Sequence, residues 1–113
     1  MKLPNGHRAY IDSRKLRDYC LNPRSTKGRD KAKVFSLVLG LTQQDDKTLR
    51  SAILQAVIAE ECQLGEVDRH GQRFSVRFEM RTPRGIGWVQ SAWIIRTGED
   101  YPRLTTCFVL KRR

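Results

Sequence analysis

The sequence has no long hydrophobic run. Its best apolar stretch, VFSLVLGL, covers only the eight residues Val34–Leu41, whereas a helix needs about 20 apolar residues to span a membrane. The amino-terminal MKLPNGHRAY also lacks the apolar core of a signal peptide. We therefore expect a cytoplasmic protein that does not insert into a membrane.

Cysteine is scarce and irregularly spaced. The chain contains three, Cys20, Cys62 and Cys107, and no two of them form a CxxC pair. An odd number of widely separated thiols predicts neither a disulfide framework nor a zinc site. We expect reduced, mostly buried thiols, which are usual in the cytoplasm.

The familiar catalytic and metal-binding motifs are also missing. The sequence contains no HExxH, GxSxG or phosphate-loop glycine pattern. Its two histidines, His7 and His70, lie in or beside expected turns, which favours exposed loop positions over a role as general base. The acidic pairs at 45–46 and 60–61 suit helix ends and do not resemble a metal site. We expect neither a metal ion nor a cofactor.

Positive charge is what the sequence has in excess. Lysine and arginine number 22 against 12 aspartate and glutamate residues, which gives a net charge of +10 over 113 residues. Such a balance is typical of a protein that binds nucleic acid or an acidic protein. A hydrophobic content of 39% argues against disorder, and the length fits a single domain covering residues 1–113.

The amino-terminal half predicts helices. Apolar residues at helical spacing place them at residues 14–21, 28–39 and 42–60. Asp12 or Ser13 can cap the first helix. Gly40 is a suitable stop for the second, and Thr42 with Asp45 resembles a capping box at the start of the third.

After Cys62 the hydrophobic period changes from 3.6 to 2, which predicts strands. They are expected near residues 64–68 and at 73–81, 88–96 and 103–110. The sequence therefore predicts an α+β domain, with two or three amino-terminal helices packed on one face of a three- to four-stranded antiparallel sheet.

The alternation also predicts which side chains face away from the helices. In strand 73–81 the apolar set points inward and leaves Arg73, Ser75, Arg77 and Arg81 on an open face. In the third strand we expect Gln90 and Arg96 on that face. In the last strand we expect the outward residues to be Arg103, Thr105 and Lys111, and the inward ones to be Leu104, Thr106, Phe108 and Leu110.

A basic sheet face with hydroxyl groups suits a phosphodiester backbone. Guanidinium groups bind phosphate through two hydrogen bonds, and the hydroxyls of Ser75 and Thr105 can donate to phosphate oxygens. A solvated polar face without function is the simpler reading, because many antiparallel sheets have one. The net charge of +10 favours a nucleic-acid-binding face, but it does not by itself decide between the two interpretations.

Lys31 is the basic residue whose position in the second predicted helix is unusual. On a helical wheel Arg29 and Lys33 fall on the polar side, whereas Lys31 shares a side with Val34 and Phe35. Its stem must run past the core edge so that the ammonium can emerge at the rim of the sheet. The alternative, equally favoured, is that the Lys31 side chain only covers apolar surface and has no role in a site.

Three runs of sequence resemble a small bacterial family of short stand-alone proteins: LRDYCLNP, GRDKAKVFSLVLGL and SAWIIRTGEDYPRLTTCFVL. That family is often labelled only as a domain of unknown function, and related copies look like carboxyl-terminal domains of polymorphic toxins. The arrangement also resembles the barnase–EndoU–colicin–RelE class of ribonuclease toxins. The resemblance implies RNA cleavage on the exposed face of a four-stranded sheet.

The chain departs from the family pattern in one loop. After Asn22-Pro23 the pattern carries histidines near the positions of Ser25 and Asp30, and this chain reads RSTKGRDK there. If those histidines are catalytic in relatives, this chain has altered chemistry. Toxins similar to RelE rely on lysine and arginine instead of histidine, so the resemblance still allows ribonuclease activity in this chain.

The leading hypothesis is a metal-independent endoribonuclease toxin that cleaves transfer, messenger or ribosomal RNA by attack of the ribose 2′-hydroxyl. It implies a small acidic antitoxin or immunity protein encoded nearby. We expect the catalytic group to be Lys31, Arg77, Arg96, Arg103 and Thr105, and the RNA-binding group to be Lys27, Arg29, Arg73, Ser75 and Arg81. The alternatives are a nucleic-acid-binding module without activity and, less favoured, an immunity or antitoxin-like protein that docks on an acidic partner.

Overall fold

A computed structural model describes residues 1–110. Three helices come first in the chain, and two of them continue into π-helical segments. They are α1 (Ser13–Lys15) with segment η2 (Leu16–Cys20), α2 (Arg29–Val34) with segment η3 (Phe35–Leu39), and α3 (Asp46–Ala59). The strands β1 (Cys62–Asp68), β2 (Gly71–Arg81), β3 (Ile86–Arg96) and β4 (Arg103–Leu110) follow. Within the described residues, no helix has the length and apolar character to cross a bilayer.

The helix ends are set by the residues that the sequence indicated. The Asp12 side chain accepts a hydrogen bond from the backbone N–H of Arg14 and caps α1. Thr42 and Asp45 form a reciprocal capping box ahead of α3. Gly40, with a φ of 67°, ends η3 in the left-handed conformation that glycine adopts at low cost. These three boundaries confirm the predicted ones.

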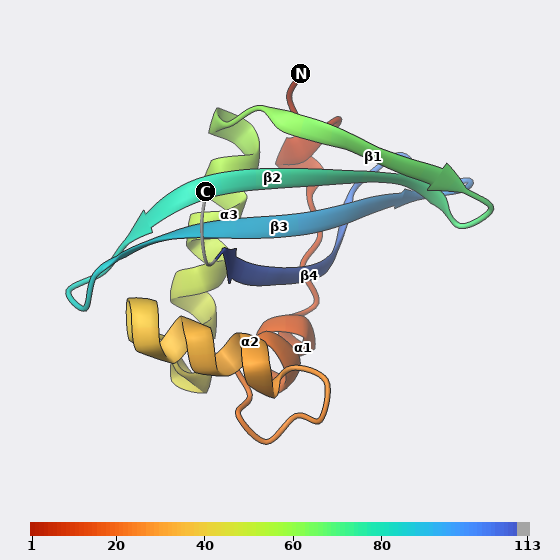
Figure 1. Cartoon of the computed structure of the whole chain (residues 1–113). Coiled ribbons are helices and arrows are strands. Elements are labelled where there is room, and N and C mark those ends of the chain that lie inside the picture. The colour runs from red at the N-terminus through yellow and green to blue at the C-terminus, as the bar shows by residue number, and fades with distance from the viewer. Residues whose placement is uncertain (111–113) are drawn as a thin grey trace.

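The strands form one antiparallel sheet in the order β1-β2-β3-β4. In Figure 1, α3 lies behind β2 and β3, α2 lies along the β4 side, and no described helix lies in front of the sheet. The predicted fold class is therefore confirmed, with helices on one face of a four-stranded antiparallel sheet.

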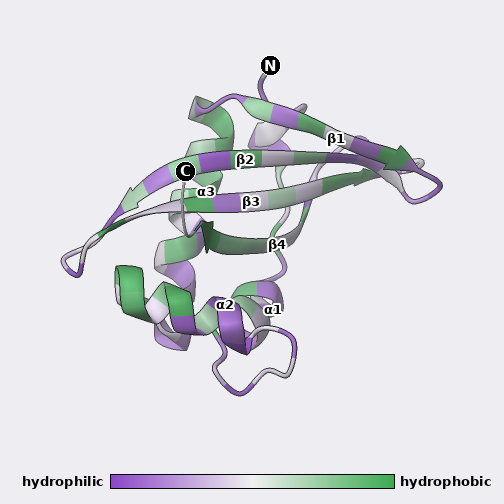
Figure 2. Cartoon of the chain, in the orientation of Figure 1, coloured by the Kyte–Doolittle hydropathy of each residue, from purple (hydrophilic) through white to green (hydrophobic). Residues whose placement is uncertain are grey.

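The two faces of the sheet differ in composition, and Figure 2 shows the alternation along β2. On the helix-packed face, Phe74, Val76, Phe78 and Met80 of β2 are buried. Their partners on β3 include Val89, Ser91 and Trp93, which are also buried. Ser91 donates to the carbonyl of Val76 and accepts from Trp93 Nε1, which satisfies the buried hydroxyl.

The prediction for β4 is wrong beyond Leu104. A bulge lies between the pairs Ala92–Thr106 and Trp93–Leu104, so Leu104 and Thr105 together face Trp93. The extra residue reverses the alternation, because a one-residue shift moves each later side chain to the other face. Beyond the bulge the inward residues are Cys107 and Val109, and those on the opposite side are Thr106, Phe108 and Leu110. Lys111 lies outside the described residues.

Gly28 is packed against the carbonyl of Tyr19 where the loop enters α2. A Cβ atom built at Gly28 would lie 2.0 Å from that oxygen. We therefore expect Gly28→Ala to lower the free energy of unfolding by about 1–3 kcal/mol, because η2 and α2 must separate to admit the methyl group. Urea unfolding measures this. Thr26→Ala, an exposed change in the same loop, should stay within about 0.5 kcal/mol, and equal losses in both variants would contradict the packing argument.

Candidate functional site

The face of the sheet away from α3 is called the open face. It consists of alternate residues of β2 and their partners on β3: Arg73, Ser75, Arg77, Glu79 and Arg81 with Ile86, Trp88, Gln90, Ala92 and Ile94. Near its middle, Arg77 Nε donates to Gln90 Oε1 over 2.9 Å. Arg81 Nη2 pairs with Glu79 Oε1 at 3.0 Å. The prediction that Gln90 faces this side is confirmed by its pairing with Arg77.

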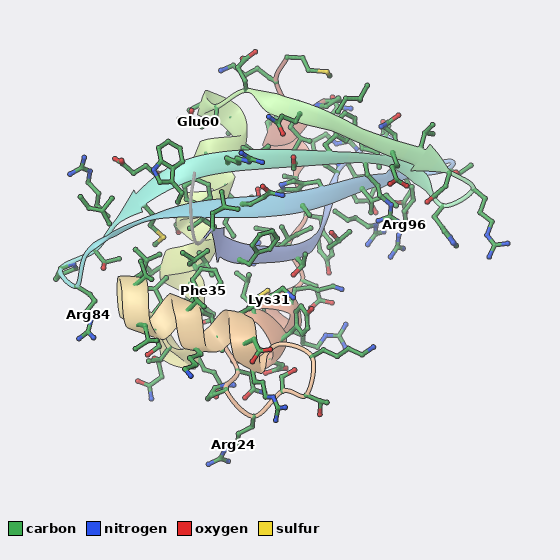
Figure 3. All side chains as sticks on the ribbon, in the orientation of Figure 1. Arg24, Lys31, Phe35, Glu60, Arg84 and Arg96 are labelled. Atoms are coloured by element: carbon green, nitrogen blue, oxygen red, sulfur yellow. The ribbon has the colours of Figure 1, made fainter. Side chains whose placement is uncertain are left out.

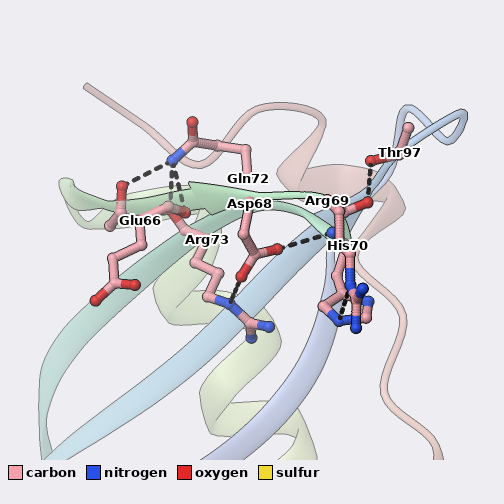
Figure 4. A network of polar contacts seen from close by, with 8 residues as sticks. Glu66, Asp68, Arg69, His70, Gln72, Arg73 and Thr97 are labelled. Atoms are coloured by element: carbon pink, nitrogen blue, oxygen red, sulfur yellow. Dashed lines mark hydrogen bonds and ion pairs between the residues drawn. The ribbon is translucent and has the colours of Figure 1, made fainter.

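Arg73 belongs to a polar network at the β1–β2 hairpin, which Figure 4 shows from close by. Its Nε lies 3.7 Å from Asp68 Oδ2, and the other oxygen of Asp68 accepts from the backbone N–H of His70. That hydrogen bond is the main cause of the lowered pKa of the Asp68 carboxyl. His70 therefore lies in the hairpin turn, and Arg73 carries a charge that is partly neutralised.

Arg103 is held by an acidic and aromatic cluster. Its guanidinium makes two hydrogen bonds of 2.9 Å to the carboxylate of Glu99 and also donates to the Tyr101 hydroxyl. Its Cζ lies 5.3 Å from the ring centroid of Tyr10 and 4.9 Å from that of Tyr101. The hydrogen bond from Arg103 lowers the pKa of Glu99, so the carboxylate stays ionised. These contacts engage Nε and Nη2, two of the three guanidinium nitrogens, so that edge of Arg103 cannot bind a phosphate as well.

Arg96 lies at the far end of β3, opposite Gly71, and Figure 3 shows it well away from Lys31. It is exposed, and its nearby charge helps to lower the pKa of Glu99. Gly71 and Arg73 are two residues apart on β2 and therefore share a face of the sheet. Arg96 pairs with Gly71, so its predicted position on the open face is confirmed. Arg96 is not among the residues that line a groove together with Lys31.

Lys31 stands where α2 meets the edge of the sheet (Figure 3). Its Nζ donates to the Tyr19 hydroxyl over 3.1 Å and lies 5.1 Å from the Tyr19 ring centroid. Lys31 also lines a groove of about 610 Å³ together with Val34 of α2 and Phe108 of β4. Phe108 pairs with Gln90 of the open face, so the groove leads onto that face. The expected position of the ammonium at the sheet rim is confirmed.

Thr105 does not lie on the open face, contrary to expectation. It occupies the β4 bulge, and its hydroxyl donates to the carbonyl of Ala92 over 3.1 Å. Together with Tyr19 and Lys27 it lines a pocket of about 540 Å³. The remaining lining residues come from the start of α1: Asp12, Arg14 and Lys15. This pocket is called the bulge pocket below.

The other predicted RNA-binding residues are dispersed. Arg29 is exposed and lines a mostly apolar cleft with Leu21 and Leu37, and this cleft adjoins the groove beside Lys31 because Leu37 lines both. Ser75 is half-buried on β2, between Arg73 and Arg77. The structure therefore brings together two groups of predicted residues, Lys31 with Thr105 and Lys27 around Tyr19, and Arg73 with Ser75 and Arg77 along β2.

The loop between Asn22 and α2 has a structural role. Ser25 Oγ accepts a hydrogen bond from the backbone N–H of Gly28 over 3.1 Å, which orders the turn ahead of α2. Asp30 is exposed in the first turn of α2 and lines the groove beside Lys31. In this loop Ser25 thus supplies a hydroxyl and Asp30 a carboxylate.

Two of the three cysteines lie next to each other beneath Lys31. A hydrogen bond from the Cys107 thiol is the main cause of the lowered pKa of Cys20, which is about 7, and the same contact raises the pKa of Cys107. Cys20 Sγ lies 3.8 Å from Thr106 Oγ1. Both thiols are fully buried, so they pack the η2–β4 contact and do not face a substrate. Within residues 1–110, no cluster of His, Cys, Asp or Glu side chains is arranged to hold a metal ion.

Two residues of the site were missed by the sequence reasoning. Tyr19 reads as part of an apolar helical stripe, and nothing in the sequence links it to Lys31, twelve positions later. Phe108 reads as a core residue because the bulge that turns it outward has no glycine or other marker in the sequence. The alternation of β4 is too short to reveal the shift on its own.

Comparison with other proteins identifies a family for the chain, and that family has no assigned activity. No curated protein matches the chain. A family model described as a domain of unknown function, DUF6883, matches residues 2–111. The match covers nearly the whole chain, including α1 to α3 and all four strands, and the protein therefore belongs to the DUF6883 family.

Proposed function

We propose that the protein is a metal-independent endoribonuclease, a toxin of a bacterial toxin–antitoxin or polymorphic-toxin system. RNA lies across the open face, and the ribose 2′-hydroxyl attacks the adjacent phosphate to leave a 2′,3′-cyclic phosphate. The observation that carries this proposal is the Lys31 ammonium, held by Tyr19 at the rim where the groove meets the open face. A cation in that position is ready to stabilise charge on a phosphoryl group.

Charge stabilisation suits the chemistry of RNA cleavage by the 2′-hydroxyl. Negative charge gathers on the phosphoryl oxygens in the transition state, and donors that are already in place cost no reorganisation. Lys31 supplies such a donor, and Arg77 supplies a guanidinium on the face that leads to it. We assign Arg103 a structural role because Glu99 and Tyr101 hold its Nε and Nη2 groups.

A partner and a location follow from the proposed activity. A protein with a net charge of +10 whose working face is basic is readily neutralised by an acidic antitoxin or immunity protein. Cellular RNA as the substrate places its action in the cytoplasm. A small acidic reading frame beside the gene would support the toxin assignment.

The direct test is incubation of the purified protein with total bacterial RNA in EDTA, followed by sequencing of the new ends. Discrete ends with 2′,3′-cyclic phosphate are expected and would also identify the target RNA. If the RNA stays intact and is retained on a filter in a salt-sensitive manner, the protein is a nucleic-acid-binding module and not a ribonuclease. Indifference to RNA at low salt would point to a protein partner.

Arg77→Gln tests whether the open face contacts the RNA backbone. Loss of one phosphate contact should weaken binding similarly for all sequences and reduce the slope of log K against log salt by about 1. Filter binding to a non-cleavable 2′-deoxy oligonucleotide at several salt concentrations measures the slope. Arg50→Gln removes an equal charge from exposed α3. Equal slopes in the two variants would mean that RNA does not bind on the open face.

A further inference from the structure

We infer that the bulge pocket receives the scissile phosphodiester and that Tyr19 donates a proton to its leaving 5′-oxygen. The inference rests on the proposed ribonuclease activity and names the reacting centre within it. Tyr19 was not among the residues indicated by the sequence. Its role follows from its contact with Lys31 and from the residues that share its pocket.

The bulge pocket is suited to an anion. Its lining contains three cationic side chains, Arg14, Lys15 and Lys27, and a single carboxylate, Asp12. Arg14 pairs with Asp12 at 2.7 Å, and its hydrogen bonds lower the pKa of that carboxyl to about 2. The carboxylate is thus neutralised by its own neighbour, and two lysine ammoniums remain for a phosphate group that enters the pocket.

Tyr19 connects the bulge pocket to Lys31. An ammonium can only donate, so in the 3.1 Å contact the Tyr19 oxygen accepts from Lys31 Nζ. The hydroxyl hydrogen of Tyr19 is then left for another acceptor. Because Tyr19 also lines the pocket, a phosphate oxygen held there is in reach of that hydrogen. The positive charge of Lys31 stabilises the phenolate that forms when Tyr19 gives up its proton.

The reaction balances with these groups and water. The 2′-oxygen forms a bond to phosphorus while the bond from phosphorus to the 5′-oxygen breaks. The proton of the 2′-hydroxyl passes to water, and the proton of Tyr19 passes to the 5′-oxygen. Solvent then returns a proton to the phenolate. The products are a 2′,3′-cyclic phosphate and a free 5′-hydroxyl, and the enzyme is restored.

Thr105 indicates the ribose as the sugar that binds beside the phosphate. Its hydroxyl hydrogen is already directed to the Ala92 carbonyl, so the oxygen can only accept. A ribose 2′-hydroxyl can donate to such an acceptor, and a deoxyribose cannot. Thr105 is therefore a positioning residue for the nucleophile, and it replaces the role of phosphate donor that the sequence suggested.

Tyr19→Phe tests the proton transfer with two dinucleotide substrates. The variant keeps the ring and loses the hydroxyl. One substrate has the natural 5′-oxygen, and the other has a bridging 5′-sulfur, which leaves as a thiolate without needing a proton. We expect Tyr19→Phe to slow cleavage of the oxygen substrate about a hundredfold and to cleave the sulfur substrate at nearly the wild-type rate. Tyr10→Phe, which alters a tyrosine beside Arg103, should resemble the wild type with both.

The outcomes separate this inference from the proposed function. Suppose that the wild type cleaves the oxygen substrate. If Tyr19→Phe cleaves it equally fast, or if the variant loses the same factor in rate on both substrates, Tyr19 is not the proton donor. The ribonuclease assignment still stands in either case. If the wild type cleaves neither substrate nor cellular RNA, both the inference and the proposed function are overturned.

Discussion

Lys31→Ala is expected to lower the rate of RNA cleavage about a thousandfold. The substitution removes a positive charge from the rim of the open face and the donor that orients the Tyr19 hydroxyl. A donor directed at the developing charge of a transition state contributes about 2.7–4 kcal/mol, and about 4 kcal/mol corresponds to a thousandfold change in rate. Single-turnover cleavage of a defined RNA measures the loss.

A matched control separates this local effect from a general loss of charge. Lys47→Ala removes the same charge from α3, which lies on the other side of the sheet (Figure 1). It should leave cleavage within about twofold, since an exposed distant charge is largely screened by salt. Lys31→Arg keeps the charge but moves its donors, so it should recover only part of the activity. A Lys31→Ala variant that cleaves as fast as Lys47→Ala would exclude Lys31 from the reaction.

Phe35→Ala is expected to lower the free energy of unfolding by about 3–5 kcal/mol. Phe35 is fully buried in the main core at the point where α2 passes into η3. Its removal forfeits the transfer free energy of the ring and leaves a cavity that the neighbouring side chains only partly fill. Domains of this kind are stable by about 5–15 kcal/mol, so the change removes a large part of the total.

Urea unfolding followed by circular dichroism measures the loss, and Leu37→Ala is the control on the same helical segment. Leu37 is 59% exposed, so its truncation should cost less than about 1 kcal/mol. The comparison also concerns the site, because Phe35 anchors the helix that carries Lys31. A difference of less than 1 kcal/mol between the two variants would mean that α2 is not fixed to the core through Phe35.

The helices and the fold class could be predicted because their signals are local. Asp12, Gly40 and the pair Thr42–Asp45 act on backbone groups within a few residues of themselves, so the sequence shows both partners of each interaction. The alternation in β2 extends over a long strand, which defines its buried face without knowledge of the neighbours.

The candidate site was predicted only in part. Lys31 was identified because a charge on the apolar side of a helix needs a route to solvent, and the structure provides one at the rim of the sheet. The partners of Arg103 could not be predicted, because its binding to Glu99 and Tyr101 depends on how the loop after β3 folds back. A guanidinium looks the same in the sequence whether its donors are free or occupied.

The fold class, three helix caps, the excess of positive charge and the unusual position of Lys31 all follow from the order of the amino acids. The directions of the Thr105 and Phe108 side chains and the contact between Tyr19 and Lys31 became known only from the folded chain. The physical reason is the range of the interactions. Caps and hydrophobic periods act between near neighbours in the chain, whereas a bulge in β4 and a contact between η2 and α2 arise only when distant segments pack against each other.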